Sequence, residues 1–269
     1  MPLVVCPTPI GNLEDVTLRV LRELGEADLV LCEDTRRTRT LLDRHGVRAK
    51  LLSYHRHNEA KRVEEVIPRL ESGERIALAS DAGLPALNDP GARLISSALD
   101  CGLEVVVLPG PSAVETALVA SGLVGDRYAF VGYLPRQAQA LARLWEETSA
   151  WEGPVVAFES PRRLSASLAS LAARSPERQV AVCRELTKRF EEVVRGPARE
   201  VAERFRGAPK GEVTLVIGPA AARASGATED ASAAAVAELV SAGIPRRRAA
   251  DLVARLTGIP RNRLYRRSL

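Results

Sequence analysis

The sequence predicts an α/β fold made of two α/β domains followed by a small helical extension at the C-terminus. Three observations lead to this fold class. Short apolar runs alternate with amphipathic segments over most of the chain. The length of 269 residues exceeds the roughly 100–200 residues of one domain. A segment rich in arginine follows the last apolar run.

The expected strands are runs of Val, Leu and Ile with little polar alternation, which is typical of strands covered on both faces. They are residues 3–6, 29–32, 76–79, 105–108, 155–158, 180–183 and 213–217. An amphipathic helix is expected within residues 58–73, and Pro68 should kink or shorten it.

Two further helices have clear start signals. Asp89 is expected to cap a helix whose first residue is Pro90, because proline is well tolerated at that position. Ser112 and Glu115 have the spacing of a capping box, and Gly122 is expected to end the helix that they begin.

The predicted domain organisation has four parts. A first α/β domain covers residues 1–123 and a second covers residues 124–220, with a hinge near residues 123–127. Residues 221–230 form a linker rich in small residues, and residues 231–269 form a basic helical tail.

Cysteine and histidine usage predicts no metal site and no disulfide framework. The cysteines lie far apart in sequence, and we expect buried thiols at Cys6, Cys32, Cys101 and Cys183. No apolar run approaches the ~18 residues that span a bilayer, and no basic leader precedes the first strand. We therefore expect a cytoplasmic protein without a membrane segment.

Ligands of open α/β sheets bind at the carboxyl ends of strands, so the loops after the apolar runs carry the functional expectations. Residues 7–12 (PTPIGN) replace the glycine-rich turn of a dinucleotide-binding fold. They can be a ligand loop or a stiff turn. Residues 33–37 (EDTRR) offer carboxylates for proton transfer and guanidiniums for phosphate, or else an ordinary helix start.

Three further loops have the same two interpretations. Residues 80–83 (SDAG) allow close approach of a ligand, or form a tight turn. Residues 109–113 (PGPSA) lead into a helix N-terminus. Polar residues also follow the strands at 158–161 (FESP) and 184–188 (RELTK), where each signal alone is weak.

The tail is the strongest single signal for a nucleic-acid partner. Residues 244–269 contain eight arginines and one acid, Asp251. Two helical patterns separated by Gly-Ile-Pro are typical of a helix-turn-helix, in which Tyr265 either stacks on a base or fills the core. The alternative is a helical appendage with solvated arginines.

Taken together, these motifs resemble the tetrapyrrole-methylase-like (class III) S-adenosylmethionine methyltransferases, and among them those that act on small-subunit ribosomal RNA. The resemblance covers nearly the whole chain. It is carried by the segments PTPIGN (7–12), EDTR (33–36), SDAGLPALNDP (80–90), LPGPSA (108–113), GYLP (132–135), FESP (158–161), RELTK (184–188) and Gly211-Glu212.

The resemblance implies two α/β domains with a cofactor cleft between them, and a homodimer. It also implies transfer of a methyl group from S-adenosyl-L-methionine to the ribose 2′-oxygen of a cytidine in the decoding region of 16S rRNA. One departure is Leu84, which stands where the family often has threonine, so the chain loses a hydroxyl near the expected cofactor pocket.

The resemblance also implies site residues. The cofactor site is expected to comprise Ser80, Asp81, Ala82, Gly83, Ser112, Ala113, Phe158 and Glu159. For catalysis we expect Glu33 or Asp34 to take or orient the hydroxyl proton, and Lys188 to hold phosphate. Substrate contacts are expected from Pro9, Gly11, Asn12, Arg36, Arg37, Arg184, Arg247, Arg263 and Arg266.

Two rival functions remain open from the sequence. A methyltransferase of the same class could act on a small tetrapyrrole, but such a substrate does not need the basic tail. A regulator that senses a ligand and binds DNA through the tail is the alternative from another class. Its scaffold does not require so many polar and glycine-rich loops.

Overall fold

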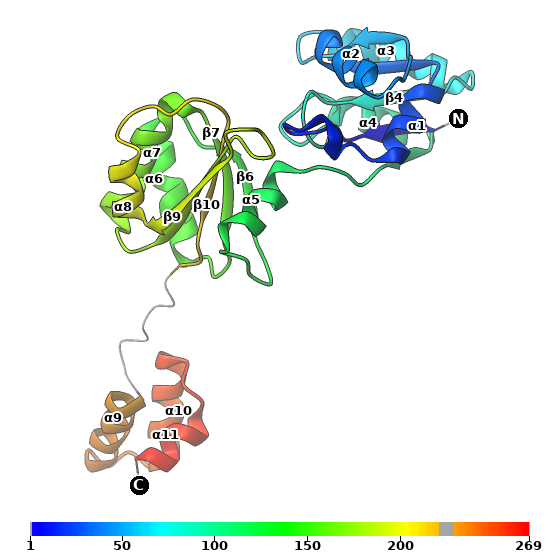
Figure 1. Cartoon of the computed structure of the whole chain (residues 1–269). Helices are drawn as coiled ribbons and strands as arrows, with labels where there is room; N and C mark the ends of the chain where they lie inside the picture. Colours follow the sequence, from blue (N-terminus) through cyan, green and yellow to red (C-terminus); the bar gives the residue numbers. More distant parts are fainter. Residues whose placement is uncertain (1, 221–228, 269) are drawn as a thin grey trace. The chain divides into compact units, whose positions relative to one another are not determined.

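The computed structural model describes residues 2–220 and 229–268, which form two compact units (Figure 1). The first unit comprises Met1–Thr148 and Gly153–Gly218, and it contains both β-sheets. The second comprises Pro219–Leu269 with the short segment Ser149–Glu152. Most of the predicted linker lies outside the described residues, and the helix after it already begins at Glu229.

The first sheet is parallel throughout and has the strand order β3-β2-β4-β1-β5. Its strands are β1 (Leu3–Cys6), β2 (Leu29–Cys32), β3 (Leu51–Ser53), β4 (Ile76–Ala79) and β5 (Val105–Val107). The central strands β1, β2 and β4 are buried along their whole length, as their continuous apolar runs predict. The half-buried edge strand β3, of three residues, was not predicted from the sequence.

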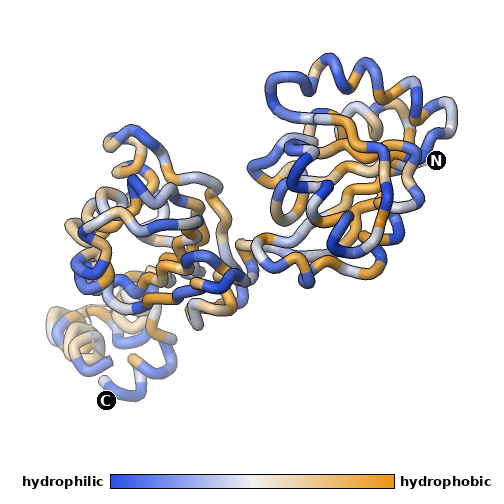
Figure 2. The backbone as a smooth tube through the Cα atoms, turned by 45° about the horizontal axis from the view of Figure 1, so that its top comes forward, coloured by the Kyte–Doolittle hydropathy of each residue, from blue (hydrophilic) through white to orange (hydrophobic). Residues whose placement is uncertain are grey.

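Helices cover both faces of this sheet. They are α1 (Leu18–Glu26), α2 (Thr35–Arg44), α3 (Glu59–Glu71) and α4 (Ala92–Asp100). Alternate strand residues pack against α3 and α4 on one face and against α1 and α2 on the other. Hydrophobic residues accordingly concentrate along the strands (Figure 2).

Two helix expectations are corrected by the structure. The α4 helix begins at Ala92 with Gly91 at its N-cap, so Asp89 is not the cap and Pro90 is not the first helical residue. The reason is that the preceding loop passes through positive φ at Asn88 and Gly91, so helical geometry starts only afterwards. Pro68 lies inside α3, which continues to Glu71, and the kink expected there stays a prediction.

The capping box does not form. Ser112 is the N-cap of α5 (Ala113–Ser121), but its hydroxyl donates to the Glu115 carboxylate instead of accepting from the backbone. Glu115 also accepts a 2.6 Å hydrogen bond from the Tyr128 hydroxyl, so both of its carboxylate oxygens accept from hydroxyl groups and neither accepts from the N-cap backbone. The expected end of the helix at Gly122 is confirmed, because this residue is a left-handed C-cap.

The second sheet is mixed and has the strand order β6-β7-β10-β8-β9. Its strands are β6 (Ala129–Tyr133), β7 (Val155–Glu159), β8 (Gln179–Arg184), β9 (Glu192–Pro197) and β10 (Val213–Ile217). The missed strands β6 and β9 contain only short apolar runs, Ala-Phe-Val and Val-Val, and both are largely half-buried edge strands. The register of β6 shifts between Phe130 and Tyr133, where Gly132 has a positive φ.

Four helices pack around this second sheet. They are α5, α6 (Ala138–Glu147), α7 (Pro161–Arg174) and α8 (Ala198–Arg204). Residues of α5 pack against β7, β8, β9 and β10, so this helix belongs with the second sheet. The domain boundary predicted at residue 123 thus follows a helix that packs on the second sheet.

The second unit contains α9 (Glu229–Ser241), α10 (Arg246–Thr257) and α11 (Arg261–Arg267). Val236, Ala249, Ala250, Val253 and Leu264 form its small core. The two helical patterns separated by Gly-Ile-Pro are thus helices that pack on each other and on α9. None of the helices in residues 2–220 and 229–268 is long and apolar enough to cross a membrane.

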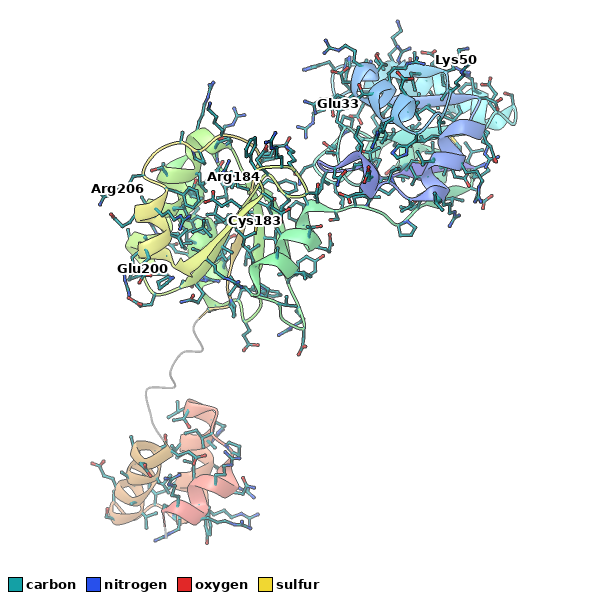
Figure 3. All side chains as sticks on the ribbon, in the orientation of Figure 1. Glu33, Lys50, Cys183, Arg184, Glu200 and Arg206 are labelled. Carbon is teal, nitrogen blue, oxygen red and sulfur yellow. The ribbon has the colours of Figure 1, made fainter. Side chains whose placement is uncertain are left out.

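The expectation of four buried thiols is wrong for one of them. Cys101 is exposed because it follows the last residue of α4, whereas Cys6, Cys32 and Cys183 are buried. Burial raises the pKa of each of these three thiols. In Figure 3, Cys183 lies within the second sheet, whereas the charged side chains of Glu200 and Arg206 project outward from the part of the chain that surrounds this sheet.

Thiol labelling tests this assignment. We expect a water-soluble aromatic disulfide reagent to modify one thiol per native chain rapidly, because only an exposed thiol can reach the reagent as thiolate. The remaining three should react only after unfolding. The C101S variant should lose the fast phase, and a fast phase that persists in it would contradict the assignment.

Candidate active site

A cavity of about 460 Å³ lies in the first unit, a size within the roughly 300–1,000 Å³ of ligand pockets. Loops after β2, β4 and β5 of the first sheet line one side, as expected for the carboxyl ends of parallel strands. Residues of β6, β7, β8 and β10 line the other side. The structure therefore brings loops of both sheets to one site.

The loops after β1 and β4 hold each other in place. Thr8 and Gly83 exchange backbone hydrogen bonds of 2.9 Å. The Thr8 hydroxyl donates to the Ser80 carbonyl at 2.9 Å, and the Ser80 hydroxyl donates to the Gly83 carbonyl at 2.6 Å. Ser80, predicted as a cofactor residue, is buried and borders the adjoining groove, while Asp81, Ala82 and Gly83 line the cavity.

One wall of the cavity is aromatic. The Phe158 ring lies edge-on to the rings of Phe130 and Tyr133, with centroid distances of 5.0 Å and 5.5 Å. Such a wall can stack a planar ring. Only Phe158 was predicted from the sequence. The other two lie on β6, and Tyr133 belongs to the GYLP segment that was used for the resemblance but not for the site.

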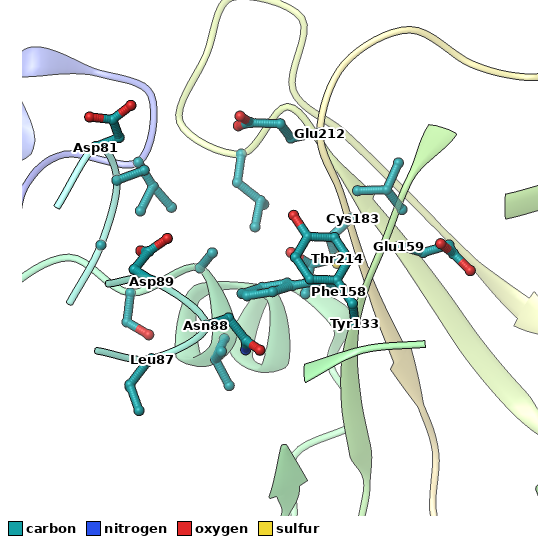
Figure 4. Close-up of a pocket in the computed structure, with 18 of the residues that line it drawn as sticks. Asp81, Leu87, Asn88, Asp89, Tyr133, Phe158, Glu159, Cys183, Glu212 and Thr214 are labelled. Atoms are coloured by element: carbon teal, nitrogen blue, oxygen red, sulfur yellow. The ribbon is translucent and has the colours of Figure 1, made fainter. Parts of the chain in front are cut away.

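The facing wall is acidic. Figure 4 shows the carboxylates of Asp81 and Asp89 on the side of the cavity opposite Phe158. Asp81 accepts a 2.9 Å hydrogen bond from the Asp34 backbone and lies 3.4 Å from the Arg37 guanidinium. Burial, together with the negative charges of Glu33 and Asp81, raises the pKa of Asp89 to about 6.

Of the predicted catalytic residues, only Glu33 lines this cavity. Asp34 is the N-cap of α2 and accepts from the Arg36 backbone at 2.9 Å and from its guanidinium at 2.8 Å. These hydrogen bonds lower the pKa of Asp34 to about 2, so it is a weak proton acceptor. They also engage Arg36, which was expected to hold phosphate.

Lys188 lies in an adjoining groove with the predicted substrate residues Pro9 and Gly11. Its ammonium group donates to Glu185 at 2.9 Å and to Glu212 at 2.8 Å. The hydrogen bonds to these two carboxylates outweigh the effect of partial burial and raise its pKa. The charged Lys188 ammonium group is therefore already paired with two carboxylates of the protein.

The groove is built by close contact of two loops. The Asn12 backbone donates to the Thr187 hydroxyl at 3.0 Å. A β-carbon on Gly11 would lie 2.7 Å from the Leu186 carbonyl oxygen, so only glycine fits there. Arg37 lines both the groove and the cavity, whereas Arg184 is engaged by Glu192 at 3.0 Å.

The predicted cofactor residue Glu159 borders the cavity, but its side chain is fully buried. Its carboxylate accepts hydrogen bonds from Ser160 N–H at 2.7 Å, Ser167 Oγ at 2.6 Å and Arg163 at 2.9 Å. Figure 4 shows this carboxylate pointing away from the cavity side of Phe158. The arrangement indicates a structural part for the Glu159 carboxylate.

The tail arginines divide into paired and unpaired groups. Arg263 and Arg267 pair with Glu229 at 3.2 Å and 2.7 Å, and Arg261 lies 3.4 Å from Asp251. Among the described residues of the tail, four exposed arginine side chains have no hydrogen-bond or ion-pair partner. These unpaired tail arginines are Arg247, Arg248, Arg255 and Arg266.

No group of His, Cys, Asp or Glu side chains suited to a metal ion occurs among the described residues.

Two residues that line the cavity were not predicted from the sequence as site residues. Asp89 was taken for a helix cap, and Asn88 had no predicted role although its side chain abuts Gly132 of β6. Thr214 and Glu212 also line the cavity, from β10 and the loop before it.

Comparison with known proteins gives a consistent picture. The family model for Tetrapyrrole (Corrin/Porphyrin) Methylases matches residues 2–202, and that for the RsmI C-terminal HTH domain matches residues 220–269. Proteins named ribosomal RNA small subunit methyltransferase I from Mesorhizobium japonicum and Escherichia coli O157:H7 are 45% and 38% identical. Both matches cover 99% of this chain, and they cover 91% and 94% of the two relatives.

Solved structures share the fold at lower identity. Uroporphyrin-III C-methyl transferase from Thermus thermophilus, complexed with S-adenosyl homocysteine, superposes with a TM-score of 0.57 at 19% identity. That match covers 81% of this chain and 97% of the other. Diphthine synthase gives a TM-score of 0.63 at 14% identity, with 81% and 90% covered.

Proposed function

Because this chain belongs to the tetrapyrrole methylase family, and within it to the ribosomal RNA small subunit methyltransferase I family, we propose that it methylates 16S rRNA with S-adenosyl-L-methionine as donor. The target atom is the ribose 2′-oxygen of a cytidine in the decoding region. The observation that carries the proposal is the match over 99% of the chain to two relatives of that name.

The chemistry of the cavity fits this donor. S-adenosyl-L-methionine supplies a methyl group on a positively charged sulfur, which is an excellent leaving group. The aromatic wall around Phe158 can stack an adenine ring, and the acidic wall favours a cation. Ala82, Gly83 and Ala113 leave room for a ligand to approach the backbone. Leu84 contributes an apolar contact in place of a hydroxyl.

The remaining residues bind and orient the RNA. Arg37 reaches both the cavity and the groove of Pro9 and Gly11, so it can hold a phosphate beside the reacting ribose. The unpaired tail arginines supply further phosphate contacts in the second unit. Positioning the hydroxyl against a good leaving group can provide much of the rate. By the same resemblance, the protein acts as a homodimer in the cytoplasm.

The deciding experiment supplies methyl-labelled donor and small ribosomal subunits that lack the native modification. After nuclease digestion and mass analysis of the nucleosides, label is expected in 2′-O-methylcytidine. Subunits that already carry the modification are the matched control and should take up no label. Label in another nucleoside would overturn the target atom, and label on a tetrapyrrole but not on RNA would overturn the substrate class.

A further inference from the structure

We propose that Asp89 accepts the proton of the ribose hydroxyl during methyl transfer, an inference that rests on the proposed function. The geometry points to this residue because its carboxylate lines the cavity opposite the aromatic wall and has no hydrogen-bond or ion-pair partner among the described residues. Glu33 is the other acidic residue of the cavity whose carboxylate has no such partner among the described residues. The carboxylates of Asp81, Glu159 and Glu212 already have partners.

The backbone of the Asp89 loop is held on both sides. The Arg56 guanidinium donates to the Asn88 carbonyl at 2.7 Å, and the Gly91 N–H donates to the Glu59 carboxylate at 2.9 Å. Asn88 itself has a φ of 63°, a sparsely populated conformation for a residue with a side chain. Strained backbone of this kind persists where surrounding contacts over-determine it, as at many active sites.

A third contact fixes the loop relative to the aromatic wall. The Asn88 side chain lies so close to Gly132 of β6 that a β-carbon there would be 2.8 Å from Asn88 Oδ1. Tyr133, the next residue of β6, belongs to that wall. The loop is therefore anchored to both sides of the cavity, and its next residue, Asp89, has few alternative positions.

Charged and titratable groups of several elements surround Asp89. They are Glu33 and Arg37 after β2, Arg56 after β3, Asp81 after β4, Tyr133 on β6 and Glu212 before β10. Burial and the two nearest acids disfavour the charged form of Asp89, and Arg56 opposes them. The resulting pKa of about 6 leaves the carboxylate ionised at neutral pH yet basic enough for proton transfer.

Methyl transfer and proton transfer occur together in the proposed step. The 2′-oxygen forms a bond to the methyl carbon while its proton moves to the Asp89 carboxylate. The carbon–sulfur bond breaks and its electron pair stays on sulfur, which loses its positive charge. The products are the 2′-O-methyl ribose, S-adenosylhomocysteine and protonated Asp89, which returns its proton to water.

The D89N variant tests this role in single-turnover methyl transfer to unmodified small subunits, with saturating donor, between pH 5 and pH 8.5. We expect the rate at pH 7.5 to fall about 100-fold or more, the effect typical of a lost general base. The wild-type rate should rise through an apparent pKa near 6, and D89N should lack that rise. Calorimetry should show somewhat weaker donor binding, because the acidic wall loses one negative charge, and the saturating donor keeps this effect out of the measured rate.

A matched control is D100N, the same change at an exposed position on α4, which should behave as the wild type. The E33Q variant is the second arm. Removing this negative neighbour lowers the pKa of Asp89, so the acid limb of the rate profile should move to lower pH.

The outcomes separate the alternatives. If E33Q abolishes the acid limb while D89N only shifts it, Glu33 is the proton acceptor and the inference is wrong. Wild-type rate and pH profile in D89N would also overturn it. If the wild-type protein labels no small subunit at any pH, the proposed function itself fails, which is a different result from both.

Discussion

Glutamine at the four unpaired tail arginines is expected to weaken the salt dependence of small-subunit binding by about three units of slope. Each phosphate contact contributes about 0.7–0.9 to the slope of log affinity against log salt, because bound counterions are released. A slope difference of about three means that, between 50 and 200 mM salt, the wild-type protein loses about 60-fold more affinity than the variant. Filter binding or fluorescence anisotropy over this salt range measures the difference.

The paired arginines provide the matched control. Arg263 and Arg267 already have a carboxylate partner in Glu229, and its negative charge reduces the attraction of this pair of arginines for phosphate. The double variant R263Q/R267Q should therefore change the slope by less than one unit. Arg263 was predicted from the sequence as a substrate contact, and this comparison tests that prediction. Equal slope changes in the two variants would contradict the division into paired and unpaired arginines.

The E159A variant is expected to lower the free energy of unfolding by about 3 kcal/mol. The Glu159 side chain is fully buried, and its removal leaves Ser160 N–H and Ser167 Oγ without an acceptor. Arg163 loses its ion pair as well, although it still donates to the Leu134 carbonyl at 2.6 Å. Leaving buried donors unpaired costs more than the net gain of the original bonds. Urea unfolding followed by circular dichroism measures the change.

Two further variants serve as controls for the loss of stability in E159A. E147A removes an exposed carboxylate near the end of α6 that has no partner among the described residues, and should change stability by less than about 0.5 kcal/mol. E159Q keeps the shape of the side chain but only one of the two oxygens that accept from Ser160 and Ser167, so it should fall between E159A and the wild type. If the free energy of unfolding falls as little in E159A as in E147A, the buried Glu159 carboxylate does not stabilise the fold.

Much of the fold follows from local patterns. The continuous apolar runs placed β1, β2, β4 and β10 at their observed bounds, because strands covered on both faces exclude polar residues. The same reasoning failed for β3, β6 and β9. Their burial is only partial and depends on which strands and helices pack beside them, which no local pattern records.

The site shows the same division. The rule that ligands bind after the strands located most of the cavity loops, and the resemblance added Phe158 and Ala113. Neither the rule nor the resemblance distinguished Glu33 from its neighbour Asp34. In the structure the Asp34 carboxylate caps α2 and binds Arg36, whereas Glu33 lines the cavity. Adjacent residues differ here because helix geometry gives the N-cap side chain a different task from that of the residue before it.

Local sequence thus specifies which segments become strands and which loops meet at their carboxyl ends, because periodicity and apolar content act over a few residues. Only the tertiary structure decides which charges remain unpaired. Lys188 meets Glu212, and the charge of Glu33 acts on Asp89, across separations in sequence that no spacing rule covers. The protonation chemistry of the site depends on these long-range contacts, since burial and neighbouring charges set the pKa of each group.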